Sequence, residues 1–105
     1  MRESEFQAHL IKTLKTLLPD CVVLKNDSSY MQGVPDLLIL FNDRWAMLEV
    51  KASANAAQQP NQQIWVEQFN EMSFSAFIYP ENEGVVLRAL QRSFGLGGPT
   101  RVSKR

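Results

Sequence analysis

The spacing of apolar side chains predicts most of the secondary structure. Near the start of the chain, leucines and a phenylalanine recur every three or four residues, which predicts an amphipathic helix over residues 3–18 that Pro19 ends. Three short apolar runs then predict strands, at residues 21–25, 36–41 and 45–51. Only the turn at residues 42–44 separates the last two runs, so we expect them to form a hairpin.

Helical spacing returns in the second half of the chain. Residues 62–72 predict a helix whose apolar stripe carries Trp65, Phe69 and Met72. Residues 75–79 predict a fourth strand. We expect a last helix over residues 82–93, with a strand as the alternative around its valines. Polar connections separate these elements, at residues 26–35 and 52–61.

The order of these elements predicts an α/β fold. Three successive strands followed by a helical crossover to a fourth favour a mixed four-stranded sheet flanked by helices, with the order αβββαβ. The strand at residues 36–41 is apolar on both faces, so we expect both faces to be covered. Residues 1–95 then form a single domain, and residues 96–105 form a flexible basic tail.

Composition narrows the class of protein. The chain has 105 residues, 45% of them hydrophobic and 21% charged, which is typical of one globular domain. No apolar run approaches the roughly 20 residues of a membrane helix. The lone cysteine, Cys21, has no partner within the chain for a disulfide. We therefore expect a cytoplasmic protein with no membrane partner.

The formal charge is zero, but the charges are unevenly distributed. Residues 1–83 hold all 11 acidic residues, whereas the segment from residue 84 onward holds five basic residues and no acid. Three of them lie in the tail and are candidate contacts for a polyanion, namely Arg101, Lys104 and Arg105. The alternative is that they are merely solvated.

Charges at the ends of two apolar strands carry the candidate chemistry. In a hairpin with a tight turn at residues 42–43, Asp36 lies directly opposite Glu49, with their Cβ atoms about 5 Å apart. Two such carboxylates repel each other unless one is protonated or a cation lies between them. Carboxylates suit Mg²⁺ or Mn²⁺, and a metal beside Lys51 is suited to phosphodiester hydrolysis. Alternatively, Asp36 caps a loop, and Glu49 and Lys51 end a frayed strand.

The segments GVPDLLIL and EVK, with Glu49 lying 13 positions after Asp36, resemble the PD-(D/E)XK nuclease superfamily. The resemblance covers roughly residues 3–80 and is strongest to small VRR-NUC-type phage nucleases and archaeal-type Holliday junction resolvases. It implies a restriction-endonuclease-like core. It also implies that Asp36, Glu49 and the backbone carbonyl of Val50 bind Mg²⁺, with Mn²⁺ as a substitute, and that Lys51 is catalytic.

Such nucleases usually add a glutamate from the first helix. On a helical wheel Glu3 falls on the buried stripe and Glu5 on the opposite side, so we expect Glu3 to be the metal ligand. They also often use a glutamine from the start of the next helix, for which there are four candidates, Gln58, Gln59, Gln62 and Gln63. Gln62 shares the apolar side of its helix and is the predicted site residue.

These features together predict a metal-dependent endodeoxyribonuclease for branched or structured DNA, acting as a homodimer. The alternatives are a nuclease or nickase without structure preference, and a non-catalytic DNA-binding module on the same fold. Polar and basic residues before Asp36 are candidate DNA contacts, although such a loop can equally be an ordinary connection. They are Lys25, Ser28, Ser29, Tyr30 and Gln32.

Overall fold

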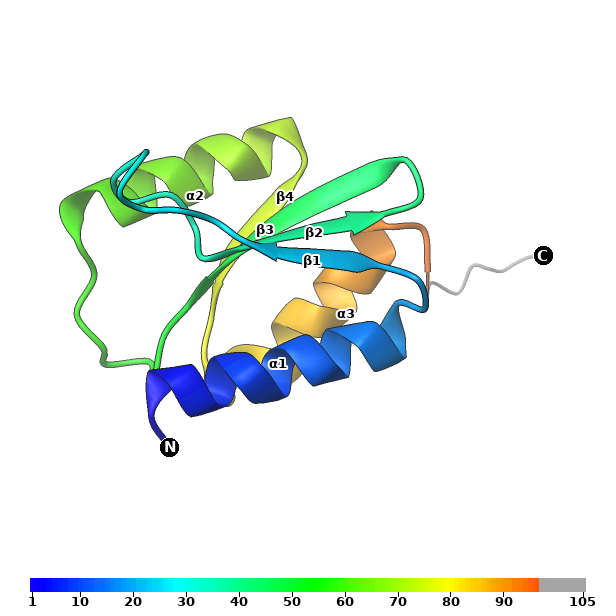
Figure 1. Ribbon diagram of the computed structural model, residues 1–105, viewed down its shortest axis with the longest axis horizontal. Coiled ribbons are helices and arrows are strands. Elements are labelled where there is room, and N and C mark those ends of the chain that lie inside the picture. The colour runs from blue at the N-terminus through cyan, green and yellow to red at the C-terminus, as the bar shows by residue number, and fades with distance from the viewer. Residues whose placement is uncertain (97–105) are drawn as a thin grey trace.

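The computed structural model describes residues 1–96, and the candidate DNA contacts Arg101, Lys104 and Arg105 lie outside them. Figure 1 shows how the helices pack around one sheet. The elements in chain order are α1 (Glu3–Leu17), β1 (Val22–Lys25), β2 (Leu37–Phe41), β3 (Arg44–Val50), α2 (Pro60–Met72), β4 (Phe74–Ile78), the 3₁₀ turn η1 (Pro80–Asn82) and α3 (Glu83–Ser93). The αβββαβ order and the final helix are confirmed.

The strands form one four-stranded sheet in the order β1-β2-β3-β4. The first three strands pair antiparallel, and β4 joins β3 in parallel, so the predicted mixed sheet is confirmed. Leu37 pairs with Leu48 and Phe41 with Arg44, which is the predicted hairpin register. The turn is therefore Asn42-Asp43, and Asn42 adopts a φ of 56°, a left-handed conformation that asparagine tolerates.

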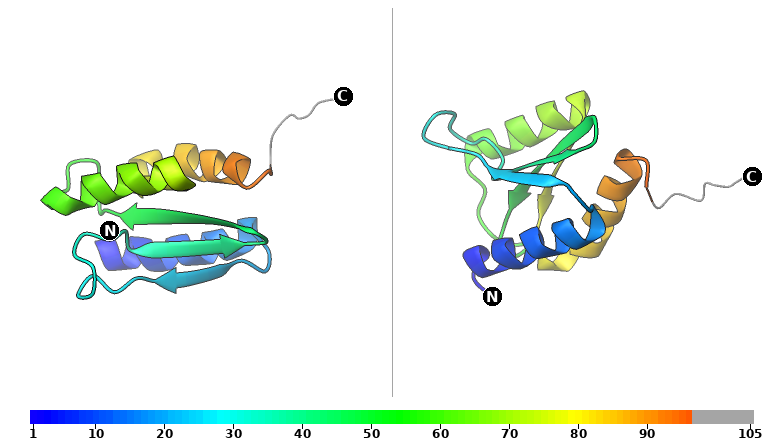
Figure 2. Two further views of the ribbon diagram at one scale, coloured as in Figure 1. Left: turned by 90° about the horizontal axis from the view of Figure 1, so that it is seen from above. Right: turned by 45° about the vertical axis from the view of Figure 1, so that its right-hand side comes forward.

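One face of the sheet packs against α1 and α3 (Figure 2, right). Alternate residues of β2 and β3 point to this face, as the period of two requires. Together with the predicted stripe of α1 and the inner face of α3 they form the core, whose fully buried members include Leu10, Leu14, Leu37, Ile39, Leu48, Val50 and Ile78. Burial of this apolar surface is the main source of stability.

The other face packs against α2, which contacts β3 and β4. Trp45 of β3 meets Phe69 of α2 edge to face at 6.2 Å between ring centroids, and Trp65 stacks on Phe69 at 5.5 Å. The part of this face over β1 and β2 stays open, because α2 covers the two strands that it connects. Val22 is 49% exposed and Leu40 36%, so the expectation that both faces of the second strand are covered is wrong.

Several predicted boundaries shift by one or two residues. The helix expected over residues 62–72 begins at Pro60, since proline suits the first helical position. Met72 is 64% exposed, whereas Val66, the residue after Trp65, is buried at 7% exposure, so the inward face of α2 is rotated from the predicted stripe. Leu96, assigned to the tail, packs against the core. Within residues 1–96, no helix combines the length and apolarity that crossing a membrane requires.

Candidate active site

Asp36 and Glu49 meet at the open end of the β2–β3 hairpin. The register places Asp36 opposite Glu49, one position beyond the Leu37–Leu48 pair. The Oδ2 atom of Asp36 accepts a hydrogen bond from the backbone N–H of Val50 at 2.8 Å. The carboxylate of Asp36 is therefore tied to β3, and it does not cap its own loop.

Glu49 is buried at only 2% exposure. Its Oε2 atom accepts a hydrogen bond from Nε2 of Gln62 at 2.9 Å, whereas its buried Oε1 atom has no hydrogen-bond partner among the described residues. Burial, and then the nearby charge of Asp36, raise the pKa of Glu49 to about 8. Burial likewise raises the pKa of Asp36. Glu49 therefore holds a proton more tightly than an isolated glutamate does, unless a cation replaces that proton.

Lys51 is also buried, with 7% exposure. Its Nζ atom donates hydrogen bonds to Oε1 of Gln62 at 2.7 Å and to the carbonyl oxygen of Ala57 at 3.1 Å. The same atom lies 3.8 Å from Oε2 of Glu49. The backbone N–H of Lys51 donates to the carbonyl of Ile78 at 2.9 Å. The strand end is therefore held by hydrogen bonds on both sides and is not frayed.

Gln62 connects the two charged residues. It lies in the first turn of α2, and its Oε1 atom also accepts the backbone N–H of Gln59 at 2.9 Å. Gln63 turns away from the site and donates instead to Oε2 of Glu67 at 2.9 Å. Of the four candidate glutamines, Gln62 is thus the one whose side chain reaches both Glu49 and Lys51.

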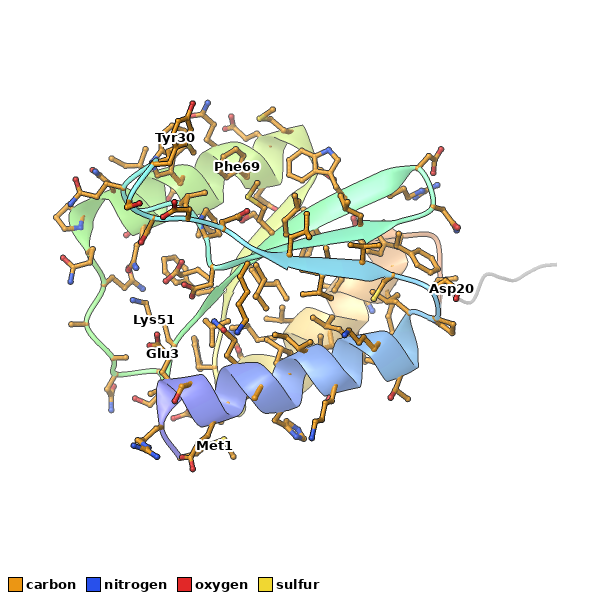
Figure 3. The ribbon with its side chains drawn as sticks, in the orientation of Figure 1. Met1, Glu3, Asp20, Tyr30, Lys51 and Phe69 are labelled. Carbon is orange, nitrogen blue, oxygen red and sulfur yellow. The ribbon has the colours of Figure 1, made fainter. Side chains whose placement is uncertain are left out.

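The two glutamates of α1 have different surroundings. Glu5 accepts a hydrogen bond from the backbone N–H of Arg2 at 2.8 Å and so caps its own helix. Glu3 is exposed at the end of the molecule where Lys51 lies (Figure 3), and its charge contributes to raising the pKa of Glu49. In residues 1–96, no three Asp, Glu, His or Cys side chains come close enough to hold a metal together. Glu3 therefore stays a predicted ligand.

The loop before Asp36 contributes a cavity of about 340 Å³. The cavity lies between this loop and the start of α2, and it is lined by Ser28, Gln32, Gly33, Val34, Asp36, Gln59, Pro60, Asn61 and Gln62. Ser28 and Gln32 thus lie beside Asp36. The other candidate DNA contacts lie outside the lining: Lys25 ends β1, Ser29 bonds to Asp27, and Tyr30 is 90% exposed near α2 (Figure 3).

Sequence reasoning missed two parts of this site. The carbonyl of Ala57 holds Lys51, but a backbone group leaves no signal in the residue types. Gly33 and Asn61 form part of the cavity wall, and Gly33 adopts a φ of 85°, which favours glycine. The glycine in the sequence could have indicated a left-handed backbone conformation at this position, whereas its contact with α2 could not be predicted from the sequence.

The donor atoms fit a small divalent cation. Asp36 and Glu49 supply carboxylate oxygens, the predicted third donor is the carbonyl of Val50, and the Oε1 atom of Glu49 has no hydrogen-bond partner among the described residues. Hard cations prefer oxygen donors, and Mg²⁺ is often bound through one or two carboxylates while it keeps several waters. This donor set is consistent with Mg²⁺ or Mn²⁺ and does not depend on Glu3.

Comparisons with protein-family models, curated proteins and solved structures found nothing that matches this chain.

Proposed function

We propose that the protein is a metal-dependent endodeoxyribonuclease with a restriction-endonuclease-like core, acting on branched or structured DNA. The observation that carries the proposal is the facing pair of Asp36 and Glu49, with one buried oxygen of Glu49 unpartnered and a buried lysine beside it. Such a pair is costly to bury for structural reasons alone. A cation bound between the carboxylates would offset that cost.

Each site residue has a distinct role in this proposal. Asp36 and Glu49 hold the metal together with the carbonyl of Val50. When bound, the metal supplies Lewis-acid chemistry, since it lowers the pKa of the attacking water and offsets the charge of the phosphate. Lys51 stabilises the negative charge that develops on the phosphate and takes part in proton transfer during the reaction. Gln62 and the carbonyl of Ala57 position its ammonium group.

The preference for branched DNA and the homodimer belong to the same proposal. The resemblance to junction resolvases motivates both. A single site cuts one strand at a time, so a junction resolvase needs two sites, which a two-fold symmetric dimer supplies. By the same resemblance, the products would carry a 5′-phosphate and a 3′-hydroxyl. Light scattering of the purified protein measures the oligomeric state, and a strictly monomeric active enzyme would contradict the dimer.

Cleavage of a labelled panel of DNAs tests the function. We expect a four-way junction to be cut with Mg²⁺ faster than a flap, a single strand and a plain duplex of the same sequence, and not at all without a divalent metal. Equal rates on all four would favour the nuclease or nickase without structure preference. Binding without cleavage in Mg²⁺ and in Mn²⁺ would favour the non-catalytic module. The Lys51→Ala variant controls for contaminating nucleases.

The helix ligand has its own test. We expect Glu3→Gln to slow cleavage and to raise the Mg²⁺ concentration needed for half-maximal rate, because the charge of Glu3 acts on Glu49 whereas Glu5 caps its own helix. Glu5→Gln is the matched control and should change the Mg²⁺ requirement little. If Glu5→Gln has the larger effect, α1 contributes the other glutamate.

A further inference from the structure

The cavity beside Asp36 has an unusual lining for a protein that binds DNA. The described residues that line it include four side-chain amides and a hydroxyl, whereas they include no lysine and no arginine. Among the described residues that line it, Asp36 alone is charged, and the proposed function assigns Asp36 to the metal. A phosphate is normally recognised by basic side chains, backbone N–H groups or helix N-termini. The start of α2 does line this cavity, but the acidic side chain of Asp36 beside it disfavours an anion. The side-chain lining therefore suits an uncharged polar ligand.

The walls of this cavity are held in place. The indole Nε1 of Trp65 donates a hydrogen bond to the backbone carbonyl of Gln32 at 3.1 Å. Gly33 approaches α2 so closely that a Cβ atom placed on it would lie 2.5 Å from Cβ of Asn61. The loop is thus joined to α2 through two consecutive residues, Gln32 and Gly33, and Figure 1 shows that it reaches the start of this helix. Such a preformed cavity loses little entropy on binding.

The size and the donor groups restrict the ligand further. A volume of about 340 Å³ is at the lower end for small-molecule sites and is far too small for a duplex. Amide side chains supply donors and acceptors together, as the edges of nucleobases require. Three amides remain available besides Gln62, which is engaged with Glu49 and Lys51; they are those of Gln32, Gln59 and Asn61.

We propose that this cavity receives one unpaired nucleobase of the DNA, next to the phosphate that is cut. The inference rests on the proposed function and names its substrate class, namely DNA in which a nucleotide beside the cut is already unpaired. In a continuous duplex the same base would first have to leave the stack, which costs free energy. Branch points and bulges avoid this cost, so the cavity selects for structured DNA without basic residues around it.

Fluorescence of a bulged base tests the cavity directly. The probe is a duplex with a single 2-aminopurine bulge, titrated without divalent metal so that no bond is cut. We expect a saturable fluorescence change with the wild-type protein. Asn61→Ala and Gln32→Ala should each weaken binding of this probe about tenfold, as expected when one hydrogen bond to the bound base is lost. Asn61→Ala keeps the Cβ atom that contacts Gly33, and Gln32→Ala keeps the carbonyl that Trp65 binds.

Gln63→Ala is the matched control, because it removes the same kind of amide from the outer side of α2. This variant should bind the bulge as the wild type does. Circular dichroism melting of all three variants checks that they fold. Equal binding by the wild type and both cavity variants would overturn the proposal, as would an unchanged fluorescence signal on saturation with wild-type protein.

A cleavage comparison with the wild-type protein needs no variant. In Mg²⁺, a bulged nucleotide is compared with an abasic residue at the same bulged position. We expect the bulge that keeps its base to be cut at least about tenfold faster, since only this substrate fills the cavity. Equal cleavage of the two DNAs would overturn the base-binding cavity and leave the nuclease intact. If neither of these DNAs is cut, and no DNA of the panel above is cut, both the nuclease activity and the role of the cavity are overturned.

Discussion

The two faces of β3 are built from the same seven-residue strand, yet they have opposite properties. On the face toward α1 and α3, Ala46, Leu48 and Val50 are all fully buried and apolar. The face toward α2 begins with Trp45 and Met47 but ends in a buried glutamate, which Lys51 follows. Alternation along a single strand thus separates the residues that stabilise the fold from those that carry the candidate chemistry.

The two faces differ in whether their packing partners satisfy all of their buried groups. The apolar face is complete once α1 and α3 pack on it, since dispersion and burial need no further partner. The α2 face keeps one buried oxygen of Glu49 without a hydrogen bond and a carboxyl group whose pKa is raised to about 8. Lys51 offsets part of the electrostatic cost of this carboxyl group, and a bound proton or metal cation would offset more of it. Substitutions on the two faces should therefore affect different measurements.

The largest effect is expected from the carboxylates. Asp36→Asn and Glu49→Gln should each reduce cleavage to background, because each removes a charged metal ligand. The free energy of unfolding should stay the same or rise, since a neutral amide avoids the cost of a buried charge. Single-turnover cleavage and urea unfolding of both variants measure the two quantities. A variant with near wild-type cleavage would show that the metal site is misplaced.

The apolar face should respond in stability instead. Leu48→Ala should lower the free energy of unfolding by about 2–5 kcal/mol, because it leaves a cavity in the fully buried core. Met47→Ala, the neighbouring residue on the other face, should cost less, since Met47 is only half-buried. Urea unfolding measures both changes. Equal losses would mean that the two faces contribute equally to stability.

The link between the charged residues should have an intermediate effect. Gln62→Ala should reduce cleavage about 10–100-fold, the usual cost of losing a group that orients a metal ligand. It leaves Glu49 without its hydrogen bond and Lys51 with only the carbonyl of Ala57 among its present acceptors. Gln63→Ala is the matched control and should cleave normally. If both variants cleave alike, Gln62 is only a helix-start residue.

The last prediction concerns the pH dependence of stability without metal. The pKa of Glu49 rises from an ordinary value of 4.5 to about 8 on folding, so the folded state binds this proton more tightly than the unfolded state. The contribution of protonated Glu49 to the free energy of unfolding is fully present below pH 4.5 and is lost as pH rises toward 8. Added Mg²⁺ should restore it. Urea unfolding over a range of roughly pH 5 to pH 9 should show the free energy of unfolding decrease as pH rises. The Glu49→Gln variant should show a weaker dependence on pH.

Local sequence was sufficient to predict the strands, the helices and the facing carboxylates. A two-residue turn and the period of two determine which residues of a hairpin face each other, so Asp36 and Glu49 could be paired without knowing the rest of the fold. The periodicity of α1 likewise identified Phe6, Leu10 and Leu14 as buried and placed Glu5 on the outside. Both predictions depend on neighbours that are close in sequence.

Tertiary structure alone decided how far α2 extends over the sheet and what it contacts. The exposure of Leu40 and Met72, the carbonyl of Ala57 on Lys51 and the cavity between Gly33 and Asn61 all follow from where this helix lies after its crossover. Periodicity indicates which face of a helix is apolar, but it does not indicate which strands that face will cover. The chain determines the chemistry of the site locally, whereas packing between distant segments determines the space around it.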